Sequence, residues 1–327
     1  MSWFTSNGEV DDVLTNWINR KFVSDLMWDL QFQKFTTKAI IPEGGGSAGI
    51  YVTFSQPILT TGYALGSAAL TQGNTGTEHE ITSITTAGAT CTPAEYGEWY
   101  RLGNLMSYSA ARGTAEKIQK RMNDGAALAL DSATRGDALN STSYVYATLA
   151  VPGATTTAPA TVGNLGAQAI VSCNKILKAA YVPKFKGIEG HPDGHYAAIL
   201  TPTQELQIVT EVSSTKVTWK DMSIYVAGSM GQAKVINGYI GSIYGVACYI
   251  TQDYTTTTLT SAVEIGYVIG DGGMGAMAFG DMDPQILFNE INSPYKNVKS
   301  IAWYAMYDSV LIAAARVLKL YSLTVAV

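Results

Sequence analysis

Residues 36–95 constrain the fold more than any other part of the chain, because charges nearly vanish there and Thr, Gly, Ala and Ser dominate. In residues 50–55, Ile, Val and Phe alternate with residues that carry a hydroxyl group, which predicts a strand. Residues 80–85 alternate less regularly. Between them, residues 73–77 (GNTGT) carry a turn signal. We therefore predict a long β-hairpin. A segment this poor in large apolar side chains cannot bury a core of its own, so we expect it to lie on another surface.

The segments on either side of this stretch have helical patterns. Residues 11–35 begin with Asp11 and Asp12, which can cap a helix, and continue with apolar side chains spaced by three to four residues. This aromatic stripe must be buried on the chain's own core or on a neighbouring subunit. Residues 96–135 also have one mainly apolar face, which predicts a long helix. Gly113 and Gly125 weaken it by about 1 kcal/mol each relative to Ala.

The rest of the chain mixes shorter helices with many strands. A loop rich in Thr, Ala and Pro, with one strand, is expected at 140–164. Helices are expected at 165–182, ended by Pro183, and from Pro202 to about residue 212. Strands are expected at 196–200, twice within 235–250, at 263–269, and twice within 300–320 on either side of Asp308 and Ser309. Because no βαβ alternation is visible, the fold class is α+β.

Composition favours a chain that packs against other chains. Charged residues are 14% of the sequence, against roughly 25% in typical soluble domains. A neutral surface rich in Tyr and Thr is common at subunit interfaces, although a β-rich monomer would share it. The net charge of −5 argues against a protein whose main task is to grip nucleic acid.

Cysteine use and hydropathy exclude further classes. Cys91, Cys173 and Cys248 are far apart and form no CxxC, so we expect neither a disulfide framework nor a zinc site. A reducing compartment fits this pattern. The N-terminal residues lack the basic and apolar regions of a signal peptide. No apolar run approaches the roughly 18 residues that span a bilayer, so no membrane partner is expected.

Three segments resemble nucleotide-binding or metal-binding motifs, and each has a simpler interpretation. Residues 270–275 (GDGGMG) match GxGxxG after a strand, but no βαβ unit surrounds them, which favours a turn. His191, Asp193 and His195 could ligate zinc, but the Pro and Gly between them favour a solvated turn. Residues 43–47 (EGGGS) lack the Lys-Ser/Thr of a phosphate-binding loop. We predict no catalytic residue, no metal, no cofactor and no enzymatic activity.

A small basic cluster lies on the predicted long helix. Lys117, Lys120 and Arg121 could face nucleic acid. A solvated helix face is the favoured interpretation, because charge clusters on helices are usually that.

Several short stretches follow one another in an order that is more informative than any one of them. They are 39–44 (AIIPEG), 94–97 (AEYG), 127–131 (ALALD), 195–202 (HYAAILTP), 237–246 (NGYIGSIYGV), 270–280 with Asp283-Pro284, and 300–316. In this order they resemble the major capsid proteins of tailed bacteriophages, in particular a branch found in certain short-tailed phages. The likeness covers nearly the whole chain. The Thr-rich stretch at 140–164 and the Gly44–Gly46 run depart from the pattern.

The resemblance implies the tailed-phage major capsid fold with five parts. These are an N-terminal arm (1–35), an extended loop (36–95), a peripheral domain with a spine helix (96–165), an axial domain (166–299), and C-terminal strands that return to the peripheral domain (300–327). The arm and the loop would reach over neighbouring subunits. On this basis we expect intersubunit contacts at Trp17, Phe22, Trp28, Glu43, Tyr51, Phe54 and Glu95.

The resemblance also implies a function and partners. The chain would assemble with itself into hexamers and pentamers of an icosahedral head in the virion, after synthesis in the bacterial cytoplasm. Scaffolding protein, portal protein, a cement or decoration protein and non-specifically held double-stranded DNA would be its partners. Three alternatives remain open: the shell of a cellular nanocompartment with the same fold, an enzyme that holds a nucleotide at residues 270–275, and a β-rich adhesin.

Overall fold

In the computed structural model, the described residues form two large sheets, a separate two-stranded sheet and three α-helices. The described residues are 30–41, 52–57, 86–103, 113–147, 154–155, 162–188, 190–211, 238–258, 262–279, 285–290 and 298–324. The α+β class is confirmed. Among these residues, no helix is both long and apolar enough to cross a membrane.

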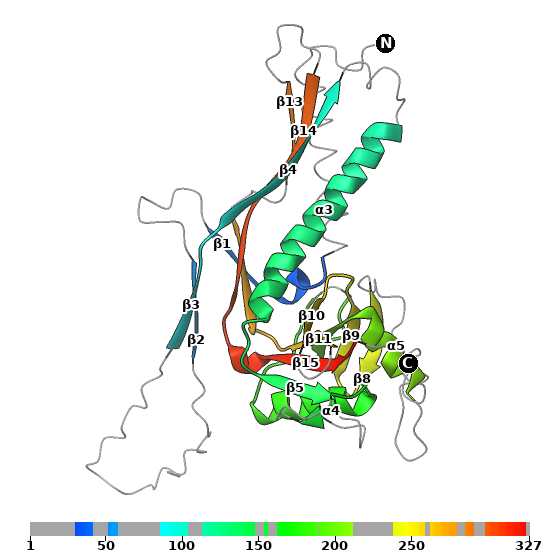
Figure 1. The fold of residues 1–327 in the computed structure, drawn as a ribbon. Helices are drawn as coiled ribbons and strands as arrows, with labels where there is room; N and C mark the ends of the chain where they lie inside the picture. The colour runs from blue at the N-terminus through cyan, green and yellow to red at the C-terminus, as the bar shows by residue number, and fades with distance from the viewer. Residues whose placement is uncertain are drawn as a thin grey trace, which may run out of the picture.

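The first sheet, which we call the elongated sheet, is built around one long strand (Figure 1). This strand is β14 (Val298–Leu311). On one side it pairs antiparallel with β4 (Ala94–Gly103). On the other side it pairs with β13 (Gln285–Glu290) and β12 (Met274–Phe279), and β1 (Thr37–Ile41) adds in parallel to β12.

The long helix α3 (Gly113–Ala138) lies on one face of the elongated sheet (Figure 1). Alternate residues of β14, including Trp303 and Tyr307, meet Met122 and Leu130 of the helix in one buried cluster. This alternation follows from the two-residue repeat of a strand, and the helix contributes residues at its own spacing. A long helix in this part of the chain is confirmed.

Two sequence predictions in this region were wrong. Residues 96–103 are strand and not helix, because Tyr96 and Tyr100 both face α3 while the backbone pairs with β14. Asp308 and Ser309 do not separate two strands, since both are paired with β12 inside β14. The chain turns later, at the 3-10 helix η2 (Ala314–Arg316), before β15 (Val317–Leu323).

The second sheet, which we call the broad sheet, has eight strands in the order β6-β5-β15-β11-β7-β9-β8, with β10 beside β11. Its central strands are β11 (Ala262–Ile269), β7 (Tyr196–Leu200) and β9 (Val246–Ile250). Its outer strands are β5 (Tyr144–Ala147), β6 (Ala154–Thr155), β8 (Tyr239–Ile243) and β10 (Thr255–Thr258). The strands predicted at 196–200 and 263–269, and the strand-turn-strand within 235–250, are confirmed for the described residues.

Both faces of the broad sheet are covered. Helix α4 (Ala167–Ala179) packs Ile170, Cys173 and Leu177 on one face. The opposite face receives Phe32 and Phe35 from the segment that contains the 3-10 helix η1 (Gln33–Phe35). Residues 30–36 therefore form one short turn and not the end of a long helix, and residues 1–29 lie outside the described residues. The helix predicted at 165–182 is confirmed.

Helix α5 (Pro202–Thr210) begins where the sequence predicts. Thr201 and Gln204 form a reciprocal capping box, and Pro202 occupies the first turn, where its missing N–H costs nothing. The buried carboxylate of Glu264 accepts hydrogen bonds from the hydroxyls of Thr201 and Thr203, which ties the helix to β11.

A two-stranded hairpin leaves the elongated sheet (Figure 1). It consists of β2 (Val52–Pro57) and β3 (Thr86–Cys91), which pair antiparallel with each other. The strand expected at 50–55 and the hairpin are confirmed, while residues 58–85 lie outside the described residues. Strands β12 and β13 join the elongated sheet, and β5 and β15 join the broad sheet. The five-part division stays a prediction.

Candidate assembly surfaces and the junctions that hold them

The predicted solvated turn contains two histidines, of which His191 is buried and His195 is partly exposed. His191 is buried, with Nδ1 2.7 Å from the Tyr249 hydroxyl and Nε2 3.2 Å from the His195 carbonyl. Its ring packs against Phe35 and Phe185. Burial disfavours the imidazolium and lowers the pKa of His191 to about 4. The prediction of a solvated turn is therefore wrong for His191, which is a core residue. Across the described part of the chain, no three His, Cys, Asp or Glu side chains gather as a metal site.

Within the glycine-rich stretch at 270–275, residues 270–273 form a turn that leads from β11 into β12, which begins at Met274. A dinucleotide fingerprint must instead open a helix whose N-terminus meets the pyrophosphate. Gly270 serves packing, since a Cβ there would lie 2.2 Å from Cγ1 of Val182. The predicted turn is confirmed.

The cysteines are buried and free. Burial raises the pKa of Cys173 to about 12 and raises that of Cys248 as well. Both thiols line the cluster between α4 and the broad sheet, where they pack as small apolar side chains.

Asp131 of α3 holds the segment that enters from the N-terminus. Its two carboxylate oxygens accept hydrogen bonds from the backbone N–H groups of Gln31 (2.9 Å) and Phe32 (3.0 Å). Burial raises the pKa of Asp131 to about 6, although these N–H donors act in the opposite direction. This contact fixes residues 30–36 between the helix and the broad sheet.

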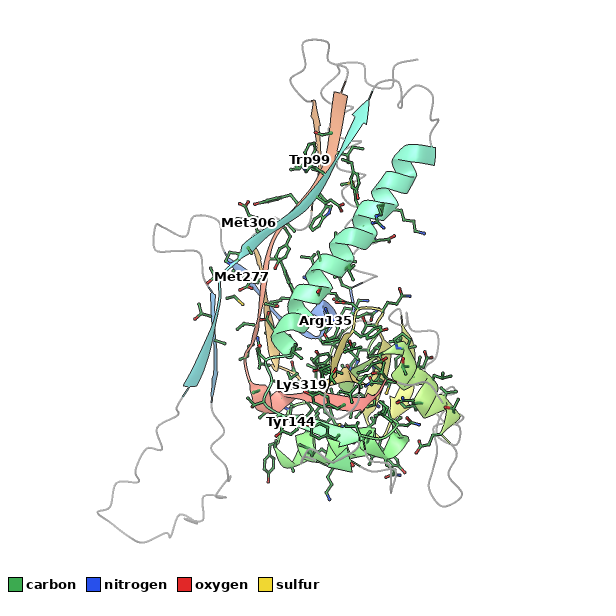
Figure 2. The ribbon with its side chains drawn as sticks, viewed as in Figure 1. Trp99, Arg135, Tyr144, Met277, Met306 and Lys319 are labelled. Carbon is green, nitrogen blue, oxygen red and sulfur yellow. The ribbon has the colours of Figure 1, made fainter. Side chains whose placement is uncertain are left out.

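Arg135 joins the same helix to the edge of the broad sheet. Its Nη2 atom lies 3.2 Å from Oδ1 of Asp253, and its Nη1 donates to Oγ1 of Thr255 at 2.8 Å. Figure 2 shows Arg135 where the lower part of α3 meets the strands of the broad sheet. This contact therefore helps to hold the two sheets in their relative positions.

The base of the hairpin is fixed on β14. The backbone N–H of Thr92 donates to Oδ2 of Asp308 at 2.6 Å, and Cys91 is buried beside Met277. Burial, together with the nearby carboxylates of Asp308 and Asp137, raises the pKa of Cys91 to about 12. The hairpin thus leaves the body from a defined point, next to Met277 in Figure 2.

The structure places two of the seven predicted contact residues. Glu95 is exposed on β4, opposite Met306 of β14. Phe54 lies in β2 with its backbone opposite Ala89, and its side chain is outside the described part. The other five fall outside the described residues: Trp17, Phe22, Trp28, Glu43 and Tyr51. Their role in contacts stays a prediction.

An exposed apolar row on the elongated sheet was missed from the sequence. Trp99 (55% exposed) pairs with Ala302, which pairs on its other side with Leu287 (41% exposed). These residues alternate with the ones that face α3, so they lie on the opposite face (Trp99 in Figure 2). If residues 96–103 are treated as a strand with a two-residue repeat, Trp99 falls on the face opposite Tyr96 and Tyr100. On α3, Lys120 and Arg121 are exposed, and the side chain of Lys117 is outside the described part.

Comparison with solved structures finds the same arrangement in phage particles. The capsid of Ralstonia phage GP4 matches with a TM-score of 0.59 and 12% identity over 90% of each chain. The head structure of Helicobacter pylori bacteriophage KHP40 matches with a TM-score of 0.61 and 9% identity over 90% of this chain and 91% of that one. A structure of Mycobacterium phage Che8 matches with a TM-score of 0.55 and 13% identity over 89% and 90%. No protein-family model and no curated protein matches the sequence.

Proposed function

We propose that this chain, which has the fold of the major capsid proteins of tailed phages, is a shell-building subunit of a phage head. The observation that carries the proposal is the extent of the likeness, which spans about nine tenths of this chain and of the capsid chains it matches. In this proposal the subunit assembles with itself into hexamers and pentamers of an icosahedral shell that encloses double-stranded DNA.

The hairpin supports a role in assembly. Strands β2 and β3 form a sheet of their own, and Figure 1 shows them extending away from both large sheets. An isolated two-stranded hairpin is marginally stable in water. Contact with a second subunit would supply the missing surface, and coupling order to assembly in this way lets a chain cover large areas.

The remaining partners follow from the same proposal. Scaffolding protein and portal protein would act during assembly in the bacterial cytoplasm, and a cement or decoration protein would bind the finished virion. DNA would be held without sequence specificity. The chain would have a structural role and no enzymatic one.

Electron microscopy and sedimentation of the protein produced alone, and together with its scaffolding protein, test the proposal. We expect closed shells, tubes or rings of subunits. A protein that stays monomeric under both conditions would contradict it. DNA inside the particles would separate a phage head from a nanocompartment filled with enzyme. Stabilisation against heat by a nucleotide would instead support the enzyme alternative.

A deletion tests the hairpin directly. Removing residues 42–93 leaves β1 and β4 intact, and these strands are separated by β12 and β14. Three strand spacings amount to about 14 Å, which a flexible linker of about six residues can span. We expect a soluble, folded body that forms no shells. Normal shells from this variant would contradict the role assigned to the hairpin.

A further inference from the structure

Two tyrosines occupy backbone positions that favour glycine. Tyr181 has a φ of 52° just after α4, and Tyr244 has a φ of 45° in the turn between β8 and β9. The N–H of Val182 donates to the Leu177 carbonyl at 3.0 Å, which closes α4 with a left-handed residue that is usually Gly or Asn. Tyr244 precedes Gly245, whose φ is 84°, so both central residues of this hairpin turn are left-handed. The first of them is usually Asn, Asp or Gly.

Burial does not explain why tyrosine stands at these positions. The side chain of Tyr181 is 67% exposed and that of Tyr244 is 59% exposed. Both side chains thus stay largely in water while their backbones adopt a conformation that tyrosine disfavours. Strained positions of this kind collect at functional sites, and Tyr is enriched at protein interfaces.

The two tyrosines belong to one patch with two lysines. The Asn174 amide of α4 donates to the Tyr244 carbonyl, which holds the turn against the helix. The Nζ atom of Lys184 lies 5.4 Å from the centroid of the Tyr196 ring. A Cβ atom on Gly245 would lie 2.9 Å from the same Nζ atom. The backbone N–H of Tyr181 donates to the Lys178 carbonyl at 3.0 Å, which joins these two residues at the end of α4. Burial lowers the pKa of Lys184, and the charge of Lys178 lowers it further. We call Lys178, Tyr181, Lys184 and Tyr244 the tyrosine–lysine patch.

A surface of opposite character lies at the other end of α4. The Glu211 carboxylate, directly after α5, accepts a hydrogen bond of 2.7 Å from the backbone N–H of Ala167, the first residue of α4. The patch is at the far end of this helix, which is about 20 Å long at 1.5 Å per residue. Helix α5 leaves Leu206 and Val209 exposed beside Glu205. We call these three residues the α5 face.

We propose that the tyrosine–lysine patch of one subunit docks on the α5 face of a second copy of this chain. The lysines would meet Glu205, and the tyrosine rings would cover Leu206 and Val209. Because the two surfaces differ and lie at opposite ends of α4, the contact is head-to-tail. Such a contact closes into a ring when the rotation that relates neighbouring subunits closes, and otherwise extends into an open filament. This inference rests on the proposed function and names two surfaces through which subunits would join.

A double glycine variant separates contact from folding. Tyr181→Gly with Tyr244→Gly should leave the unassembled subunit at least as resistant to heat as the parent, because glycine adopts both conformations readily. The apparent association constant, measured by sedimentation over a concentration series, should fall about tenfold or more. The control is Tyr254→Ala, which removes an exposed tyrosine outside the patch and should associate as the parent does.

A charge swap tests the identity of the partner surface. Lys178→Glu alone and Glu205→Lys alone should each weaken association, and the two together should restore it, because every subunit then carries the pair in reverse. A double glycine variant that associates like the parent would overturn the inference. So would a charge swap that leaves association as weak as in the single variants. Failure of the parent protein to form any assembly, with scaffolding protein present, would count against the proposed function instead.

Discussion

The Nη2 atom of Arg135 lies 3.2 Å from Oδ1 of Asp253, and this ion pair joins the long helix of the elongated sheet to an edge of the broad sheet. Both side chains are largely shielded from water. Burial raises the pKa of Asp253, while the charge of Arg135 lowers it. The pair therefore contributes to the orientation of the two sheets relative to each other.

Removing one partner of this pair should destabilise the unassembled subunit. Arg135→Met leaves the shielded Asp253 carboxylate without its cation, at an expected cost of about 2 kcal/mol in the free energy of unfolding. The double variant Arg135→Met with Asp253→Asn should recover part of that loss, because no uncompensated charge remains. Urea unfolding of Arg135→Met, Asp253→Asn and the double variant checks this. Additive effects of the two substitutions would contradict the coupling.

Asp131 should make stability fall as pH rises from 4 to 6. Its pKa is about 6 in the folded chain, raised from 3.8 by burial, so the folded state keeps a proton that the unfolded chain releases. Its contribution is fully present below about pH 4 and is lost as pH rises through about 6, a change on the order of 3 kcal/mol. The urea midpoint should fall between pH 4 and pH 7, and this fall should be smaller for Asp131→Asn than for the parent protein. Parallel curves for the two proteins would exclude this role for Asp131.

His191 should make stability fall as pH is lowered, which is opposite to the effect of Asp131. Its pKa is lowered from 6.5 to about 4, so the unfolded chain binds a proton that the folded chain rejects. The stability linked to this residue is present above about pH 6.5 and is lost as pH falls towards 4, by roughly 3 kcal/mol. His191→Phe should lower stability at pH 7 by about 1–2 kcal/mol, because the Tyr249 hydroxyl loses its partner. Thermal unfolding between pH 4.5 and 7 should then show a weaker acid dependence than the parent has. An unchanged acid dependence would assign the effect to other groups.

Two glycine substitutions should change stability with opposite signs. A methyl group on Gly270 would lie 2.2 Å from Val182 Cγ1, so Gly270→Ala should cost about 1–3 kcal/mol through overpacking. Gly136 of α3 has open space where a Cβ would be, and Gly136→Ala should stabilise by about 0.5–1 kcal/mol through helix propensity. Calorimetry of the two variants provides the comparison. A loss of stability in both would show that the space beside Gly136 is occupied.

Local sequence patterns were sufficient to predict the helices and strands whose ends are set by nearby residues. Helix α4 shows helical spacing and ends before Pro183, and α5 begins at a Thr-Pro step with a capping box, so both were predictable. The strands β7 and β11 are short apolar runs with clear ends. The poverty of residues 36–95 in large apolar side chains predicts that the hairpin lies on another surface, and this stays a prediction.

The exposed surfaces for which we propose a role in assembly were less accessible from the sequence. Glu95 was expected to be a contact residue and is exposed, but the neighbouring Trp99 was assigned to a helix and its row was missed. The tyrosine–lysine patch joins the end of α4 to a turn that follows more than sixty residues later, so only the fold brings its members together. The left-handed backbone of Tyr181 and Tyr244 gives no signal in the sequence, because tyrosine does not predict it.

The sequence by itself determined the α+β class and most individual elements, since these follow from the periodicity of apolar side chains. The tertiary structure decided what depends on partners distant in the chain. Residues 94–103 became a strand because β14, some two hundred residues later, offers a complete antiparallel edge. His191 became a core residue because Phe35 and Tyr249 enclose it. Asp131 and Gln31 are 100 residues apart, and their hydrogen bond forms only after the helix, the N-terminal segment and the broad sheet have packed together.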